Sequence, residues 1–95
     1  MEIKIKELLK NIKNELIGKH IAFYGEIRKK YMYIGIVKEV DTYGKDYIGR
    51  PNIKLVTSID CLYLDGISNL KEVQDAVFTF ESQNDAELFI EMKNA

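Results

Sequence analysis

The side chains able to act as a base or a nucleophile are few and scattered. His20 is the only histidine and Cys61 is the only cysteine. A catalytic histidine needs a partner that orients its ring, and a reactive thiol needs a cation or a helix N-terminus nearby. The sequence shows neither beside these residues, and no histidine is placed to activate Thr57 or Ser58. We therefore expect structural roles for His20 and Cys61, and no enzymatic activity.

Metal ions and cofactors have no recognisable site in the sequence either. A structural zinc site is usually built from four cysteine or histidine ligands, and the chain holds one of each. Asp41, Gly44 and Asp46 share one segment, but their spacing differs from that of a calcium-binding loop. The glycine-rich motifs that bind phosphates and dinucleotides are absent from the sequence. We predict no cofactor and no metal.

Length and charge narrow the function further. The 95 residues are enough for one domain with a single core. The 14 Lys and Arg side chains nearly balance the 15 Asp and Glu side chains, giving a net charge of −1, whereas dedicated nucleic-acid binders usually carry a basic excess. A single cysteine fits a reducing compartment, and no signal peptide or membrane-spanning run is recognisable. We expect a cytoplasmic protein without a membrane partner.

One short segment departs from this charge balance. Arg28, Lys29 and Lys30 form a turn between two strand-like segments, and Tyr31 follows directly. Cations beside aromatic rings can neutralise phosphates and stack on bases, so nucleic-acid binding is the alternative hypothesis. Cations also keep the edge of a hairpin soluble, and the balanced total charge favours that interpretation.

The irregular segment 41–50 is the second candidate surface. It contains Tyr43, Tyr47 and Arg50, and long loops of this kind often carry function. Tyr and Arg are enriched at the hot spots of protein–protein interfaces, because they combine a large contact area with hydrogen-bonding groups. Since nucleic acid is disfavoured and no catalytic set is present, we predict that the chain binds another protein through this loop and the basic turn.

The segment Ala76–Glu91 resembles the strand-then-helix step of an RNA-recognition motif. Phe78 and Phe80 are interleaved like the stacking aromatic residues of that family, and a helix with an acidic start follows. The resemblance would imply base stacking on these two rings. The basic residue and the glycine of the family's aromatic strand motif are missing here, and no strand-like segment follows the helix. We therefore do not assign the chain to this family.

Apolar periodicity predicts the elements that position these surfaces. Helical spacing runs over residues 3–17, and Gly18 follows where a left-handed cap is common. The first residues also alternate at period two, so a short initial strand is left open. A second helix is predicted over 84–93, capped by Ser82 or Asn84, with one apolar face. Residues 68–74 fit either a loop or a helical turn capped by Ser68. The expected apolar face of the second helix consists of Leu88, Phe89 and Met92.

Alternation at period two predicts the strands, and Asp65-Gly66 predicts a two-residue hairpin turn. Successive strands without intervening crossover helices favour an antiparallel sheet. We predict an α+β fold, with a small, strongly bent sheet or an SH3-like barrel of about five strands flanked by the two terminal helices. The predicted strands are 20–27, 31–40, 52–58, 59–64 and 76–81.

Together these features predict a non-enzymatic, cytoplasmic protein-binding module. Phages and plasmids often encode inhibitors of host machinery, including anti-CRISPR proteins, as single compact domains of this kind, so such an inhibitor is the specific expectation. The candidate contact residues lie in two neighbouring segments, and a homodimer through edge strands or terminal helices is a further expectation. The candidate contact residues are Arg28, Lys29, Lys30, Tyr31, Tyr43, Tyr47 and Arg50.

Overall fold

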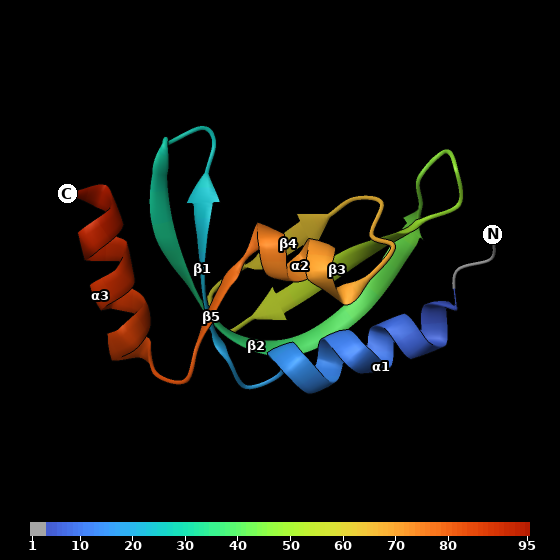
Figure 1. Ribbon diagram of the computed structural model, residues 1–95, viewed down its shortest axis with the longest axis horizontal. Coiled ribbons are helices and arrows are strands. Elements are labelled where there is room, and N and C mark those ends of the chain that lie inside the picture. Colours follow the sequence, from blue (N-terminus) through green and yellow to red (C-terminus); the bar gives the residue numbers. More distant parts are fainter. Residues whose placement is uncertain (1–3) are drawn as a thin grey trace.

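A computed structural model describes residues 4–95, which form three helices and five strands (Figure 1). The α+β class is as predicted. Residue 3, where the first helix was expected to begin, lies outside the described residues, as do the first three residues of the alternating segment 1–6. In chain order the elements are α1 (Ile5–Leu16), β1 (His20–Gly25), β2 (Lys30–Lys45), β3 (Pro51–Thr57), β4 (Cys61–Leu64), α2 (Leu70–Ala76), β5 (Phe78–Phe80) and α3 (Gln83–Asn94).

All five strands belong to one antiparallel sheet with the order β4-β3-β2-β1-β5. The first four strands pair in succession, and β5 returns to pair with β1. Strands β4 and β5 lie at opposite edges and do not pair with each other, so the sheet is open. The five-stranded antiparallel sheet is thus confirmed, whereas a closed SH3-like barrel is not.

Strand β2 is the longest element and belongs to both halves of the sheet. Residues 30–36 pair with β1, and residues 37–45 pair with β3. The strand curves between these halves (Figure 1), at a β-bulge opposite Ile21 and Ala22. Bulges bend a strand and increase its twist. The strong bend therefore follows from an irregularity within one continuous strand.

Gly35 lies at this bend and allows it. Its φ is +102°, a conformation that favours glycine, and a Cβ here would lie 2.4 Å from the Oγ of Ser58. Ser58 belongs to the turn between β3 and β4. Its hydroxyl accepts a hydrogen bond from the Ile36 N–H at 3.0 Å, and its own N–H donates to the Ile36 carbonyl at 2.9 Å. The turn is thereby fastened to β2 where β2 bends.

The aliphatic core lies between α1, α2 and one face of the sheet. Leu8, Ile12 and Leu16 recur every four residues along α1 and are all buried, which is why this amphipathic segment is helical here. Gly18 has the predicted left-handed conformation, and its N–H donates to the Val37 carbonyl at 2.9 Å. The core is completed by Ile21, Ile34, Val37, Val40, Ile53, Leu55, Ile67, Val73 and Val77.

Helix α3 packs on a separate aromatic cluster beside β1, β2 and β5. The Phe89 ring contacts the rings of Tyr31, Phe78 and Phe80, with centroids 5.5, 4.8 and 5.2 Å away. The helix begins at Ser82, whose hydroxyl accepts a hydrogen bond from the Asp85 N–H at 3.1 Å. One end of α3 is thus fixed by a cap and its middle by aromatic packing.

The three apolar residues predicted to share one face of α3 differ in burial. Phe89 packs against the aromatic cluster, and Ala86 is fully buried. Leu88 and Met92 are 57% and 69% exposed. Helical spacing identifies a stripe of apolar residues, but the aromatic cluster decides which side of the helix is buried. The exposed pair lies on the outer side of α3.

Two connections also differ from the sequence predictions. Strand β2 continues to Lys45, five residues beyond its predicted end, because β3 pairs with it as far as Pro51. The Asp65-Gly66 pair does not form a hairpin. The Ile67 N–H donates to the Pro51 carbonyl at 2.8 Å instead, which turns the chain towards α2. Asn69, rather than Ser68, caps this helix by accepting from the Glu72 N–H.

Candidate functional site

The seven predicted contact residues lie at the two ends of β2. Lys30 and Tyr31 begin the strand, after a turn that carries Arg28 and Lys29. Tyr43 is near the other end, before a turn that carries Tyr47 and Arg50. The molecule is 42 Å along its longest axis, and Figure 1 shows the two turns well separated. The structure therefore divides the predicted surface into two separate sites.

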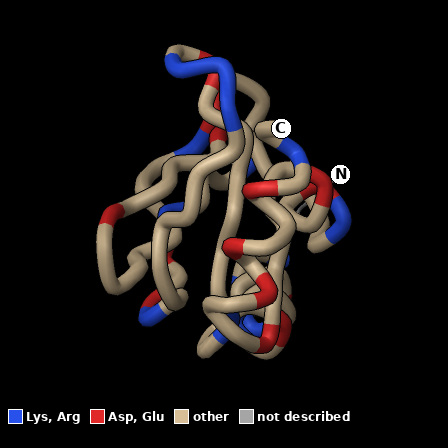
Figure 2. The backbone as a smooth tube through the Cα atoms, turned by 90° about the vertical axis from the view of Figure 1, so that its left-hand side faces the viewer, with Lys and Arg blue, Asp and Glu red and all other residues tan. Residues whose placement is uncertain are grey.

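The first site is the turn of residues 26–30, which we call the hairpin tip. Arg28, Lys29 and Lys30 are exposed, and Figure 2 shows this basic segment projecting from the rest of the chain. Among residues 4–95, none of the three takes part in an ion pair. Ile27 at the same tip is 98% exposed. The alternation of apolar residues placed Ile27 inside the strand predicted over 20–27, whereas β1 ends at Gly25, so sequence reasoning missed its exposure at the tip.

Tyr31 does not belong to this exposed surface. Its ring lies between Tyr24, Phe78 and Phe89, at centroid distances from 5.2 to 5.8 Å. Its backbone is held from the end of α3: the Tyr31 N–H donates to Asn94 Oδ1 at 2.8 Å, and Asn94 Nδ2 donates to the Tyr31 carbonyl at 2.9 Å. Tyr31 therefore anchors the hairpin to α3.

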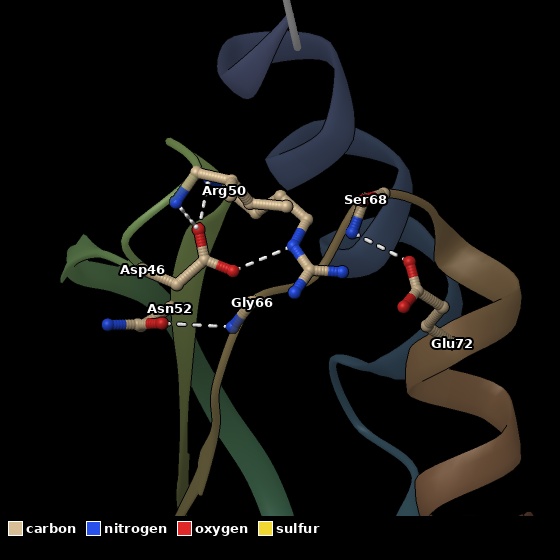
Figure 3. A network of polar contacts seen from close by, with 7 residues as sticks. Asp46, Arg50, Asn52, Gly66, Ser68 and Glu72 are labelled. Atoms are coloured by element: carbon tan, nitrogen blue, oxygen red, sulfur yellow. Dashed lines mark hydrogen bonds and ion pairs between the residues drawn. The ribbon is translucent and has the colours of Figure 1, made fainter.

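The second site is the turn between β2 and β3, which is built around Asp46 (Figure 3). Asp46 Oδ1 accepts hydrogen bonds from the backbone N–H groups of Ile48 and Arg50, at 3.1 and 2.8 Å. Its Oδ2 accepts from Arg50 Nε at 2.7 Å. The backbone closes the turn as well, because the Asp46 N–H donates to the Arg50 carbonyl at 2.8 Å. One carboxylate thus fixes both ends of the turn.

Arg50 is held inside this network. Burial works to raise the pKa of the Asp46 carboxyl, but the hydrogen bonds from Arg50 and Ile48 and the guanidinium charge bring that pKa below its ordinary value. The same pair raises the pKa of Arg50. Gly66 lies close to this ion pair, because a Cβ built at Gly66 would be 2.6 Å from Asp46 Oδ2. Arg50 therefore has a structural role in this turn, and its contact with a partner stays a prediction.

Tyr43 is also engaged within the chain. Its hydroxyl donates a hydrogen bond to the Asp65 carboxylate, and its ring meets that of Tyr63 edge-on with centroids 5.0 Å apart. The hydrogen bond to Asp65, assisted by burial and the negative charge, raises the pKa of Tyr43 to about 12. Tyr43 joins β2 to the segment after β4.

Tyr47 and Ile48 remain exposed at the apex of the second turn. Their exposed fractions are 94% and 59%, and we call this pair the Tyr47 tip. Gly49 follows with φ +87°, and its N–H donates to the Asp46 carbonyl at 3.1 Å. Sequence reasoning named Tyr47 but missed Ile48. The signal that could have identified Ile48 is its position as an apolar residue in the short polar segment between Asp46 and Arg50.

A third exposed surface lies on the outer side of α3 and was not predicted. Leu88 and Met92 line a shallow groove together with the half-buried Phe80 and Phe89 and the exposed Asp85 and Glu91. Figure 1 shows α3 at the same end of the molecule as the hairpin tip, and Figure 2 shows acidic residues along this helix. We call this surface the α3 groove.

His20 and Cys61 lie outside these three surfaces. His20 Nδ1 and Tyr33 Oη are 2.9 Å apart, with the two rings stacked. Burial, assisted by the charge of Glu87, raises the pKa of Tyr33. Cys61 is half-buried in β4. Within residues 4–95, no three His, Cys, Asp or Glu side chains are grouped so as to hold a metal ion.

No family model, no curated protein and no solved structure matches the chain. In the part of the chain that the structure describes, no helix is both long and apolar enough to cross a membrane. The function is therefore argued from the exposed surfaces themselves.

Proposed function

We propose that the chain is a non-enzymatic protein-binding module whose main contact is the Tyr47 tip. The observation that carries the proposal is the exposure of Tyr47 and Ile48 on a turn that Asp46 holds in one conformation. Neighbouring apolar side chains that stay exposed on a folded domain often mark an interaction site. Tyr47 and Ile48 are such a pair, so they are candidates for burial against a partner.

The rigidity of this turn is a second argument for binding, in addition to the exposure of its apex. Association loses free energy when a loop or side chain must be ordered at the interface. The Asp46 hydrogen bonds order this backbone before any partner arrives. Tyrosine is also among the residues enriched at interface hot spots, since its ring is large and its hydroxyl forms hydrogen bonds. A preformed apex of this kind suits insertion into a pocket of another protein.

Occupation of a partner's pocket would make the chain an inhibitor of that partner. This is the mode in which a single small domain acts without chemistry of its own, and it agrees with the phage- or plasmid-type inhibitor expected from the sequence. The proposed partner is therefore a component of host machinery in the reducing cytoplasm.

A capture experiment with matched variants tests the proposal. The immobilised chain is incubated with a lysate of the cells that encode it, alongside Tyr47→Ala and Tyr63→Ala. Tyr63 is a half-exposed tyrosine on β4 and serves as the control. We expect a protein that the wild type and Tyr63→Ala retain and that Tyr47→Ala loses. The proposal is wrong if every retained protein is also retained by Tyr47→Ala.

Nucleic-acid binding through the hairpin tip is the alternative, favoured by the cations Arg28, Lys29 and Lys30, which take part in no ion pair within residues 4–95. It lacks the aromatic partner it was expected to have, because Tyr31 packs against Phe89. If these cations contact phosphates, oligonucleotide affinity should fall steeply with salt, and Lys29→Ala should flatten that dependence by about one phosphate. No binding at low salt would exclude this alternative.

A further inference from the structure

The end of the molecule opposite the Tyr47 tip carries two exposed surfaces of opposite character. The hairpin tip holds three cations and one carboxylate, Glu26, around the fully exposed Ile27. Helix α3 holds three carboxylates and one lysine, with Leu88 and Met92 exposed between them. The near-neutral total charge of the chain thus hides a separation of charge at this end.

The α3 groove has the chemistry of a receptor for a basic, apolar-tipped segment. Leu88 and Met92 offer exposed apolar surface, and the half-buried Phe80 and Phe89 line the same groove. The exposed carboxylates of Asp85 and Glu91 line it as well. Direct pairing of α3 with the α3 of a second copy would bring these like charges together, which is unfavourable. The carboxylates of the α3 groove therefore favour the binding of a positively charged segment.

The hairpin tip of the same chain is such a segment. Ile27 projects at its apex, next to Arg28 and Lys29. Lys29 has a left-handed conformation (φ +53°) in this turn, which is closed by the paired residues Gly25 and Lys30. An apolar knob flanked by cations matches an apolar groove flanked by carboxylates.

We propose that two copies of this chain form a symmetric dimer in which the hairpin tip of each copy docks into the α3 groove of the other. Ile27 packs between Leu88 and Met92, and Arg28 faces the carboxylates of Asp85 and Glu91. The tip and α3 are adjacent within one chain, as the Asn94–Tyr31 hydrogen bonds show. One two-fold axis therefore suffices to form both contacts at once.

The first test measures the mass of the purified full chain by light scattering over a concentration series. We expect a dimer at low salt whose dissociation constant rises with ionic strength, because exposed charges are screened. Ile27→Asp and Leu88→Asp should each weaken the dimer roughly tenfold or more. Ile59→Asp, at an exposed position in the β3–β4 turn, is the matched control and should leave the mass unchanged. A chain that stays monomeric up to about 1 mM at low salt overturns the proposal.

A charge exchange makes the test specific for these two surfaces. Arg28→Glu alone and Glu91→Arg alone should each give monomers, since each variant opposes like charges at both contacts. An equimolar mixture of the two variants should dimerise again, because one contact is then native and the other is reversed. The chain with both substitutions should also dimerise. Circular dichroism verifies that each variant is folded. A dimer that persists in both single variants, or a mixture that stays monomeric, refutes this mode of assembly and leaves edge-strand pairing or a different basic partner.

Discussion

Asp46 contacts Arg50 through both of its carboxylate oxygens: Oδ2 accepts from the guanidinium Nε at 2.7 Å, and Oδ1 accepts from the backbone N–H at 2.8 Å. The two residues enclose the apex of the turn, so the ion pair fixes the direction in which Tyr47 projects. Surface ion pairs usually contribute little to stability. Here the same carboxylate also binds two backbone N–H groups, which makes it the organising group of the turn.

The Asp46 carboxylate predicts a specific loss of stability in acid. Its pKa is lower in the folded protein than its ordinary value of 3.8, so the folded state binds fewer protons than the unfolded chain. Its stabilisation is therefore complete above pH 3.8 and is lost as the pH falls through the lowered folded pKa. Urea unfolding should show Asp46→Asn to be less stable than the wild type at neutral pH, with the difference shrinking in acid. A difference independent of pH would contradict this account.

Tyr43 predicts a change at the alkaline end. Its pKa is raised to about 12, first by the hydrogen bond to Asp65, so the stabilisation is present below pH 10 and is lost as the pH rises towards 12. In an ultraviolet absorbance titration, Asp65→Asn should lower the last tyrosine transition. Asp60→Asn is the control, because its carboxylate binds the Cys61 N–H instead. An unchanged transition in Asp65→Asn would exclude the hydrogen bond as the cause.

Gly35 predicts a large effect from one added methyl group. Gly35→Ala places a Cβ 2.4 Å from Ser58 Oγ in a strained backbone, whereas Gly44→Ala meets a similar positive φ with nothing within 4 Å. Chemical denaturation should therefore show Gly35→Ala to be less stable than Gly44→Ala by about 2 kcal/mol. Equal losses would mean that backbone strain alone, and not the Ser58 contact, makes glycine necessary.

Asn94 predicts a local effect on the hairpin. Asn94→Ala removes two hydrogen bonds to the Tyr31 backbone, which should cost about 1 kcal/mol and increase hydrogen exchange at the Tyr31 amide. Asn84→Ala makes the same chemical change in the first turn of α3; within the described residues its side chain forms no bond to the hairpin. Faster exchange in Asn84→Ala than in Asn94→Ala would contradict the proposed anchoring.

Local patterns predicted the parts of the fold that depend on local physics. The spacing of Leu8, Ile12 and Leu16 predicted the buried face of α1, since a four-residue repeat places side chains on one side of a helix. The left-handed Gly18 followed from its position after the last apolar residue. Strand alternation and the absence of crossover helices predicted the antiparallel sheet.

The remainder depended on contacts between distant residues. Tyr31 and Asn94 are far apart in sequence, so nothing near Tyr31 indicated that its ring and backbone would be covered. The ion pair between Asp46 and Arg50 was missed for a different reason: the two residues are only four positions apart, but their side chains meet only once the turn has formed. The exposure of Leu88 was not predicted, because spacing defines an apolar stripe on α3 without showing which part of it the sheet covers.

The continuity of β2 has a consequence for multivalent binding. A single hydrogen-bonded strand joins the hairpin tip to the Tyr47 tip, without a flexible linker between them. The effective concentration of a second contact depends on whether the spacer matches the distance between the sites. This spacer is a strand whose curvature is set at Gly35, so the distance between the two tips is fixed. A molecule that binds through both tips would therefore select targets whose binding sites have that spacing. Avidity would then be adjusted by changes at the bend, away from either contact surface.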